Sequence, residues 1–170
     1  MTGEIMLPAK LPWWRRWFVI PVVNQLTQGT SPVRLSWTIA LGIVLGIFPI
    51  MGSTTVLCLV VGYIFKLNQP ILMVFKSAAY PLHLALILVF IRLGERLYGV
   101  PLISFSIPEL VTKFNHDPLQ FARDFGMAAW HGVSAWLLIA PVAVVLIKVA
   151  VLPVIVRLSH TLRKPKEVLL

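Results

Sequence analysis

The sequence predicts an all-α fold: a polytopic helical membrane protein whose helices are broken by proline and glycine, with re-entrant hairpins as one form of the breaks. Hydrophobic residues make up 58% of the 170 residues and charged residues 12%, whereas soluble chains carry about 25% charged residues. The mean hydropathy is +0.88, and a domain of this size buries only about two thirds of its surface. This composition excludes an ordinary soluble domain, a disordered chain and a disulfide scaffold.

Positive charge is in excess, with 15 basic against 6 acidic residues and a net charge of +9. The basic residues punctuate apolar stretches and do not form a dense patch, which favours anionic lipid headgroups over nucleic acid as partners. The lone cysteine, Cys58, lies in an apolar stretch and excludes an intrachain disulfide and a cysteine-based zinc site.

Residues 1–31 are predicted to form an interfacial amphipathic segment. A helix beginning at Pro12 would place tryptophan rings at headgroup depth while arginine side chains reach lipid phosphates. An amphipathic cap packed on the rest of the protein is the alternative. The residues expected at the membrane interface are Trp13, Trp14, Arg15, Arg16 and Trp17.

Residues 32–98 contain two apolar segments, each interrupted by proline. The first has no charge over residues 35–65. That run is too long for one upright helix of about 20 residues and too short for two crossings with a loop. Pro49 and Gly52 predict a break in its middle, because proline removes a backbone donor and glycine tolerates unusual conformations.

The stretch from Gly46 to Thr55 is the leading candidate for a functional element. A helix break at membrane depth leaves backbone groups that lipid cannot satisfy, so it survives where protein buries it or where it lines a wet cavity. We expect Ser53 or Thr54 to cap the helix that follows. A tolerated kink with no ligand is the alternative interpretation.

The second apolar segment begins at a turn formed by Asn68 and Pro70, which predicts a capped helix start. Pro81 interrupts this segment near its middle, and two polar side chains, Lys76 and His83, lie within it. The lysine can snorkel to the surface from a shallow segment or meet a phosphate in a cavity. The histidine is expected to be a hydrogen-bonded interior residue.

Arg92 and Arg96 share a helix face and mark a headgroup-level boundary. Residues 99–124 are then predicted to form an amphipathic interfacial loop. Helix-start signals at Ser106 and Asp117 indicate two short helices lying on the membrane.

Residues 125–156 are predicted to be the last membrane segment, divided by Pro141 and Pro153, with Lys148 as an ionisable group inside it. Residues 157–170 form a basic tail suited to the cytoplasmic leaflet. Three simple crossings would place the two basic termini on opposite sides, against the positive-inside rule. An even number of crossings, or hairpins that return to their own side, keeps both termini in the cytoplasm.

The chain resembles a bacterial membrane family known as domain of unknown function 2062, most closely over residues 32–81. The family has a glycine-rich helix leading to a Pro-x-x-Gly break, a basic-x-Asn-x-Pro turn and a later Asn-Pro, which here reads Tyr80-Pro81. The resemblance implies a small protein of the bacterial inner membrane. Some family members are fused to glycosyltransferases that use polyprenyl-phosphate carriers. The residues that carry the resemblance are Gly42, Gly46, Pro49, Gly52, Thr55, Lys66, Leu67, Asn68, Gln69, Pro70, Tyr80 and Pro81.

Two functions fit these patterns. The first is binding or translocation of an anionic lipid, such as a phospholipid or a polyprenyl phosphate, in a polar cleft opened by the helix breaks. The second is a non-catalytic membrane anchor or assembly subunit for envelope enzymes such as glycosyltransferases. Neither requires enzyme chemistry, a metal or a cofactor, and the small size suits a homo-oligomer. The candidate lipid-binding residues are Pro49, Gly52, Thr54, Thr55, Asn68, Lys76, Pro81, His83 and Arg92.

Overall fold

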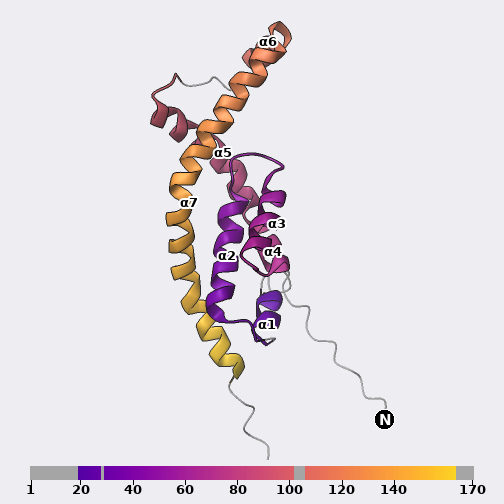
Figure 1. The fold of residues 1–170 in the computed structure, drawn as a ribbon, viewed down its shortest axis with the longest axis vertical. Helices are drawn as coiled ribbons and strands as arrows, with labels where there is room; N and C mark the ends of the chain where they lie inside the picture. The colour runs from indigo at the N-terminus through magenta and orange to yellow at the C-terminus, as the bar shows by residue number, and fades with distance from the viewer. Residues whose placement is uncertain (1–18, 28, 102–105, 164–170) are drawn as a thin grey trace, which may run out of the picture.

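The computed structural model describes residues 19–27, 29–101 and 106–163, and these residues form helices and their connections with no strand. The all-α prediction is confirmed for this part of the chain. Figure 1 shows shorter helices gathered along α7, which runs most of the length of the molecule. The helices are α1 (Ile20–Thr27), α2 (Pro32–Gly46), α3 (Thr54–Ile64), α4 (Gln69–Ala78), α5 (Tyr80–Tyr98), α6 (Ile107–His116) and α7 (Pro118–Arg163).

Two predicted helix starts are confirmed by their capping hydrogen bonds. At the start of α4, Asn68 Oδ1 accepts a hydrogen bond from the Ile71 backbone N–H at 3.1 Å. At the start of α7, Asp117 Oδ1 accepts hydrogen bonds from the backbone N–H groups of Leu119 and Gln120 at 3.0 and 2.9 Å. Each side chain satisfies donors that the first helical turn leaves without a partner.

The predicted break between α2 and α3 is present at residues 47–53. Gly52 has a φ of +83°, a backbone conformation that residues other than glycine rarely adopt. The predicted side-chain cap of α3 is wrong. Ser53 precedes the helix in a helical conformation, with φ −80° and ψ −19°, and its hydroxyl donates to the Ile50 carbonyl at 2.9 Å. Thr54 is already the first residue of the helix.

Two glycines let α2 and α4 pack closely. A Cβ atom on Gly42 would lie 2.9 Å from the Leu72 carbonyl oxygen, and one on Gly46 would lie 2.9 Å from the Lys76 carbonyl oxygen. Both contacts advance by four residues in the same direction, so α2 and α4 run parallel. Small residues at this spacing allow such close approach of helices.

The helix α3 connects these two parallel helices and runs antiparallel to them. Its first turn meets the last turn of α4, where Lys76 Nζ donates to Thr55 Oγ1 at 2.6 Å. At the start of α4, Gln69 Nε2 donates to the carbonyl of Leu59 in the middle of α3 at 3.0 Å. The chain therefore runs back along α3 toward the N-terminal end of α2, where α4 begins.

A bend of 66° at Ala79 separates α4 from α5. Pro81 lies in the first turn of α5, where its missing N–H costs no helical hydrogen bond. Farther along α5, Gly94 lies directly against the backbone of His131 in α7. The helix α5 thus leads away from α4 and packs on the N-terminal half of α7.

The helix α7 contains 46 residues and is about 69 Å long at 1.5 Å per residue. The helix runs through the segment boundaries predicted at residues 124, 125 and 156, and the second short helix expected in the 99–124 region is instead the beginning of α7. Pro141 and Pro153 lie inside the helix with exposed side chains. Membrane helices tolerate proline where local adjustment and neighbouring groups satisfy the freed carbonyls.

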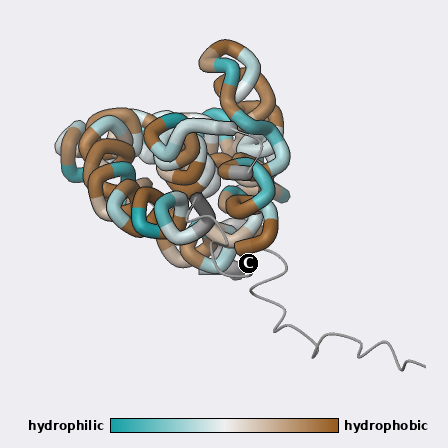
Figure 2. The backbone as a smooth tube through the Cα atoms, turned by 90° about the horizontal axis from the view of Figure 1, so that it is seen from below, coloured by the Kyte–Doolittle hydropathy of each residue, from teal (hydrophilic) through white to brown (hydrophobic). Residues whose placement is uncertain are grey.

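Large apolar side chains cover much of the outer surface, and Figure 2 shows hydrophobic residues along most of the helical tube. Among the described residues, α7 alone is long and apolar enough by itself to cross a membrane. Only 17% of its most apolar 18-residue window is buried against the rest of the protein. The bent pair α4–α5 passes the same test when its two helices are taken together.

Candidate functional site

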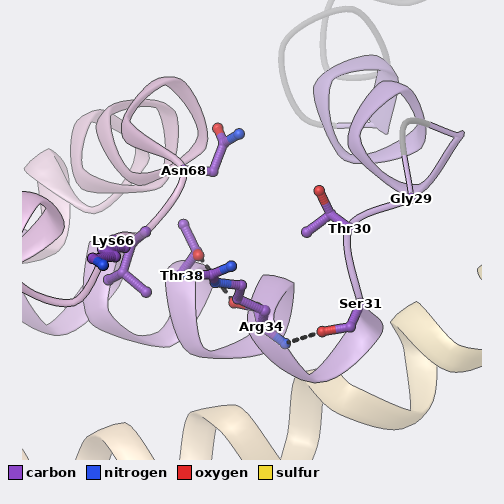
Figure 3. Close-up of a pocket in the computed structure, with 8 residues that line it drawn as sticks. Gly29, Thr30, Ser31, Arg34, Thr38, Lys66 and Asn68 are labelled. Atoms are coloured by element: carbon purple, nitrogen blue, oxygen red, sulfur yellow. Dashed lines mark hydrogen bonds between the residues drawn. The ribbon is translucent and has the colours of Figure 1, made fainter.

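A polar pocket with a volume of about 530 Å³ lies where α2 and α4 begin. Figure 3 shows Thr30 and Asn68 on opposite sides of its opening, from the α1–α2 turn and from the start of α4. The polar side chains that line it are those of Thr30, Ser31, Arg34, Thr38, Lys66 and Asn68. We call this part of the molecule the pocket end.

Two turns with unusual backbone conformations build the pocket. Gly29, with a φ of +88°, reverses the chain between α1 and α2. Lys66, with a φ of +50°, ends α3, and the Leu67 N–H returns to the Gly62 carbonyl at 2.8 Å. A left-handed residue followed by such a bond is a common way for a helix to end. This ending brings the lysine beside the start of α2.

The electrostatics of the pocket favour an anion. The side chains of Arg34 and Lys66 are exposed, and neither is paired with a carboxylate among the described residues. Among the described residues, no carboxylate lines the pocket. The parallel helices α2 and α4 both present their N-termini here, with Ser31 Oγ accepting from the Arg34 N–H at 3.3 Å. Helix N-termini carry partial positive charge and bind phosphate and carboxylate groups.

The opposite ends of α2 and α4 are closed by contacts within the protein. His83 Nδ1 donates to the Gly46 carbonyl at 2.9 Å, and Trp136 Nε1 donates to the Val44 carbonyl at 3.2 Å. Lys76 contacts Thr55, as described above. We call this part of the molecule the break end. Its donors satisfy two of the last carbonyl groups of α2, which a helix end leaves without a partner.

The structure does not bring the nine candidate residues that the sequence predicts into one site, although Thr55 and Lys76 are in hydrogen-bond contact. Asn68 alone lines the pocket end, while Lys76 lies at the far end of the same helix. His83 is buried, as predicted for an interior residue, and it caps α2. Arg92 donates to the buried carboxylate of Glu95 at 2.9 Å.

The remaining candidates form parts of the helix ends. Pro49 and Gly52 belong to the connection after α2, Thr54 and Thr55 begin α3, and Pro81 begins α5. The interface candidates Trp13, Trp14, Arg15, Arg16 and Trp17 lie outside the described residues. Within the described ranges, no three His, Cys, Asp or Glu side chains gather as a metal site.

Arg34 and Lys66 are the basic residues of the pocket, and the sequence analysis selects neither of them as a candidate. Both flank the uncharged run at residues 35–65. A usable signal was the repeated pattern of a capping residue with a nearby proline, at Ser31-Pro32 and at Asn68 with Pro70. Each pattern has a basic residue within three positions, which together predict two electropositive helix starts.

The fold and pocket define an all-α protein with at least one helix suited to crossing a membrane and a basic pocket at one end of its helices. A family model described as an uncharacterised protein conserved in bacteria, DUF2062, matches residues 16–164. The chain belongs to this family, as its resemblance over residues 32–81 predicts. Neither curated proteins nor solved structures give a significant match.

Proposed function

We propose that this chain is a multi-pass protein of the bacterial cytoplasmic membrane that binds the phosphate of an anionic lipid headgroup at the pocket end. The observation that carries this proposal is that two cations, Arg34 and Lys66, share one polar cavity of about 530 Å³ and pair with no carboxylate in the part of the chain that the structure describes. Cations and helix N-termini together are a suitable environment for a phosphate. The role is one of binding, without enzyme chemistry.

The path of the chain supports this placement in a membrane. The hairpin α2–α3 returns to its own side, the bent pair α4–α5 leads to the other side, and α7 leads back. Val22 of α1 and Ile155 near the end of α7 pack in one cluster with Leu35 of α2. Both ends of the described chain therefore lie at the pocket end, as expected if both termini are cytoplasmic.

Charge supports the same orientation. The region around α6 is balanced, with the basic residues Arg92, Arg96, Lys113 and Arg123 against the acidic residues Glu95, Glu109, Asp117 and Asp124. The pocket end carries Arg34, Lys66 and Arg157 without a carboxylate among the described residues there. Excess positive charge favours the cytoplasmic side, so the pocket would face anionic lipids of the cytoplasmic leaflet.

Titration of the detergent-solubilised protein with short-chain phosphatidylglycerol, followed by calorimetry, tests the proposal. The double variant Arg34→Gln/Lys66→Gln is expected to bind roughly thirtyfold more weakly, because each basic residue near an anionic surface contributes about a fivefold gain. The matched control Arg96→Gln/Arg123→Gln removes the same charge from α5 and α7 and is expected to bind like the wild type. Equal losses in both double variants would refute a specific site.

Two further ligands define what the pocket recognises. Phosphatidylcholine of the same chain length is expected to bind more weakly, since its headgroup has no net charge. Inorganic phosphate that displaces the lipid would show that the phosphate is the recognised group. If phosphate binds at this site and the lipid does not, the pocket is a soluble-anion site and the lipid proposal is wrong.

A specific surface supports a second function, that of an anchor or assembly subunit for an envelope enzyme. The helix α6 and the first turns of α7 project beyond the other helices, as Figure 1 shows. Val111, Phe114, Leu119 and Phe125 are exposed there. Deletion of residues 106–116 would abolish co-purification of a glycosyltransferase under this second proposal and would leave lipid binding at the pocket end intact.

A further inference from the structure

The outer face between α2 and α7 contains an apolar groove with a volume of about 390 Å³. Its wall on α2 includes Trp37, Leu41 and Val44, and its wall on α7 includes Trp136, Pro141 and Val145. It shares no residue with the pocket at the helix starts. Every side chain that lines the groove is apolar, so its occupant is hydrophobic where it contacts the protein.

A positive charge lies at one end of this groove. Lys148 follows Pro141 and Val145 at helical spacing on α7 and continues the same face. Its Nζ atom lies 5.2 Å from the ring centroid of Trp37, and no carboxylate pairs with it among the described residues. A lysine in an apolar helix is costly unless it reaches water or a counter-charge. The groove thus has an apolar body and a cationic end.

The length of the groove matches one leaflet of a bilayer. Trp136 and Lys148 are separated by about 18 Å along α7, at 1.5 Å per residue, whereas half of the hydrocarbon core is about 15 Å thick. Trp136 is fixed at the break end by its hydrogen bond to the Val44 carbonyl. Trp37 is three residues from Arg34, so the cationic end lies near the pocket end.

We propose that this groove holds one acyl chain of an anionic phospholipid from the leaflet at the pocket end, with the lipid phosphate paired with Lys148. The volume is near the lower end of the roughly 300–1,000 Å³ typical of small-ligand sites. A stable contact with a second copy would need a face of about 800 Å² on each partner. An uncharged lipid would leave the lysine without a counter-charge.

The test is native mass spectrometry of protein released from vesicles containing equal amounts of phosphatidylglycerol and phosphatidylcholine with identical acyl chains. It uses the Arg34→Gln/Lys66→Gln background, so that a lipid in the polar pocket does not contribute. Val145→Trp fills the groove, and Val142→Trp adds the same bulk to an exposed position of α7 that does not line it. Lys148→Gln removes the charge, and Lys148→Arg preserves it.

The parent is expected to retain one phosphatidylglycerol in preference to phosphatidylcholine. Val145→Trp and Lys148→Gln should each lower that occupancy roughly fivefold or more, while Val142→Trp and Lys148→Arg should retain it. Equal loss from Val142→Trp and Val145→Trp, or equal retention of both lipids, would overturn the proposal. A dimer that disappears only in Val145→Trp would identify a second copy as the occupant and would also overturn it.

Discussion

The two ends of the parallel helices α2 and α4 differ in what satisfies their polar groups. At the break end, His83 and Trp136 donate to the last carbonyls of α2, and Lys76 donates to Thr55. At the pocket end, Arg34 and Lys66 face a cavity and have no carboxylate partner among the described residues. One end is closed by the protein itself, and the other is open to a ligand.

This difference follows from the polarity of helices. A helix C-terminus presents carbonyl acceptors, and the neighbouring helices α5 and α7 supply the donors that the break end needs. A helix N-terminus presents N–H donors and partial positive charge. Two N-termini beside two cations therefore favour an anion, and the described residues that line the pocket include no carboxylate. The difference teaches that a broken helix can be closed by contacts within the protein at its break while a polar pocket stays open at its start.

The largest expected effect comes from disturbing the close packing that aligns both ends. Gly46→Val would place its Cβ atom 2.9 Å from the Lys76 backbone oxygen. The contact is with backbone, so α2 and α4 would have to move apart to relieve it. We expect a loss of about 3 kcal/mol in the free energy of unfolding, the upper range for overpacking. Denaturant titration in detergent measures it.

Gly126→Val is the matched control for this change, since a Cβ atom on Gly126 of α7 would meet nothing within 4 Å. Its effect should be small, because no neighbour has to move. Equal destabilisation by both variants would mean that the contact between α2 and α4 does not limit stability, and the comparison of the two ends would lose its structural basis.

An intermediate effect is expected at the break end. Trp136→Phe keeps an aromatic ring beside Phe48, at a present centroid distance of 5.0 Å, but removes the donor to the Val44 carbonyl. An unsatisfied buried acceptor costs about 1–3 kcal/mol. Thermal unfolding should reveal this loss in Trp136→Phe and almost none in Trp130→Phe, whose side chain is exposed. Identical melting curves for the two variants would show that the break end needs no donor.

The smallest effect is expected from the helix caps. Asn68→Ala removes the acceptor for the Ile71 N–H and should lower stability by about 1 kcal/mol. Ser53→Ala should have a smaller effect, since Ser53 makes no capping bond to α3. The same thermal unfolding assay measures both. A greater loss from Ser53→Ala would mean that the connection at the break end depends on its hydroxyl more than α4 depends on its cap.

Local chemistry explains which parts of the fold the sequence predicts. Asn68 and Asp117 begin helices because their side chains cap nearby N–H groups, and such contacts depend only on residues within a few positions. The break at Pro49 and Gly52 is likewise predicted by the preferences of those two residues. The continuity of α7 through Pro141 is not predicted by the sequence. Whether a helix continues through a proline depends on the neighbouring groups that satisfy the freed carbonyl, and these are set by the tertiary structure.

The pocket was not predicted because it depends on contacts between distant residues. Arg34 and Lys66 come together only because α2 and α4 run parallel, through the contacts of Gly42 with Leu72 and Gly46 with Lys76. Charged residues at the edge of an apolar run indicate a membrane boundary whether or not they share a cavity. The sequence instead predicts that Lys76 or Arg92 meets a lipid phosphate, and the structure places the Lys76 ammonium group against Thr55, which is another of the predicted candidates.

The most direct test of the central claim compares Arg34→Gln with Lys76→Gln for binding of short-chain phosphatidylglycerol. Each variant removes one positive charge, and the two charges lie at opposite ends of the parallel helices. We predict that Arg34→Gln weakens binding roughly fivefold and that Lys76→Gln leaves it unchanged. A larger loss from Lys76→Gln than from Arg34→Gln would place the lipid at the break end and contradict this account.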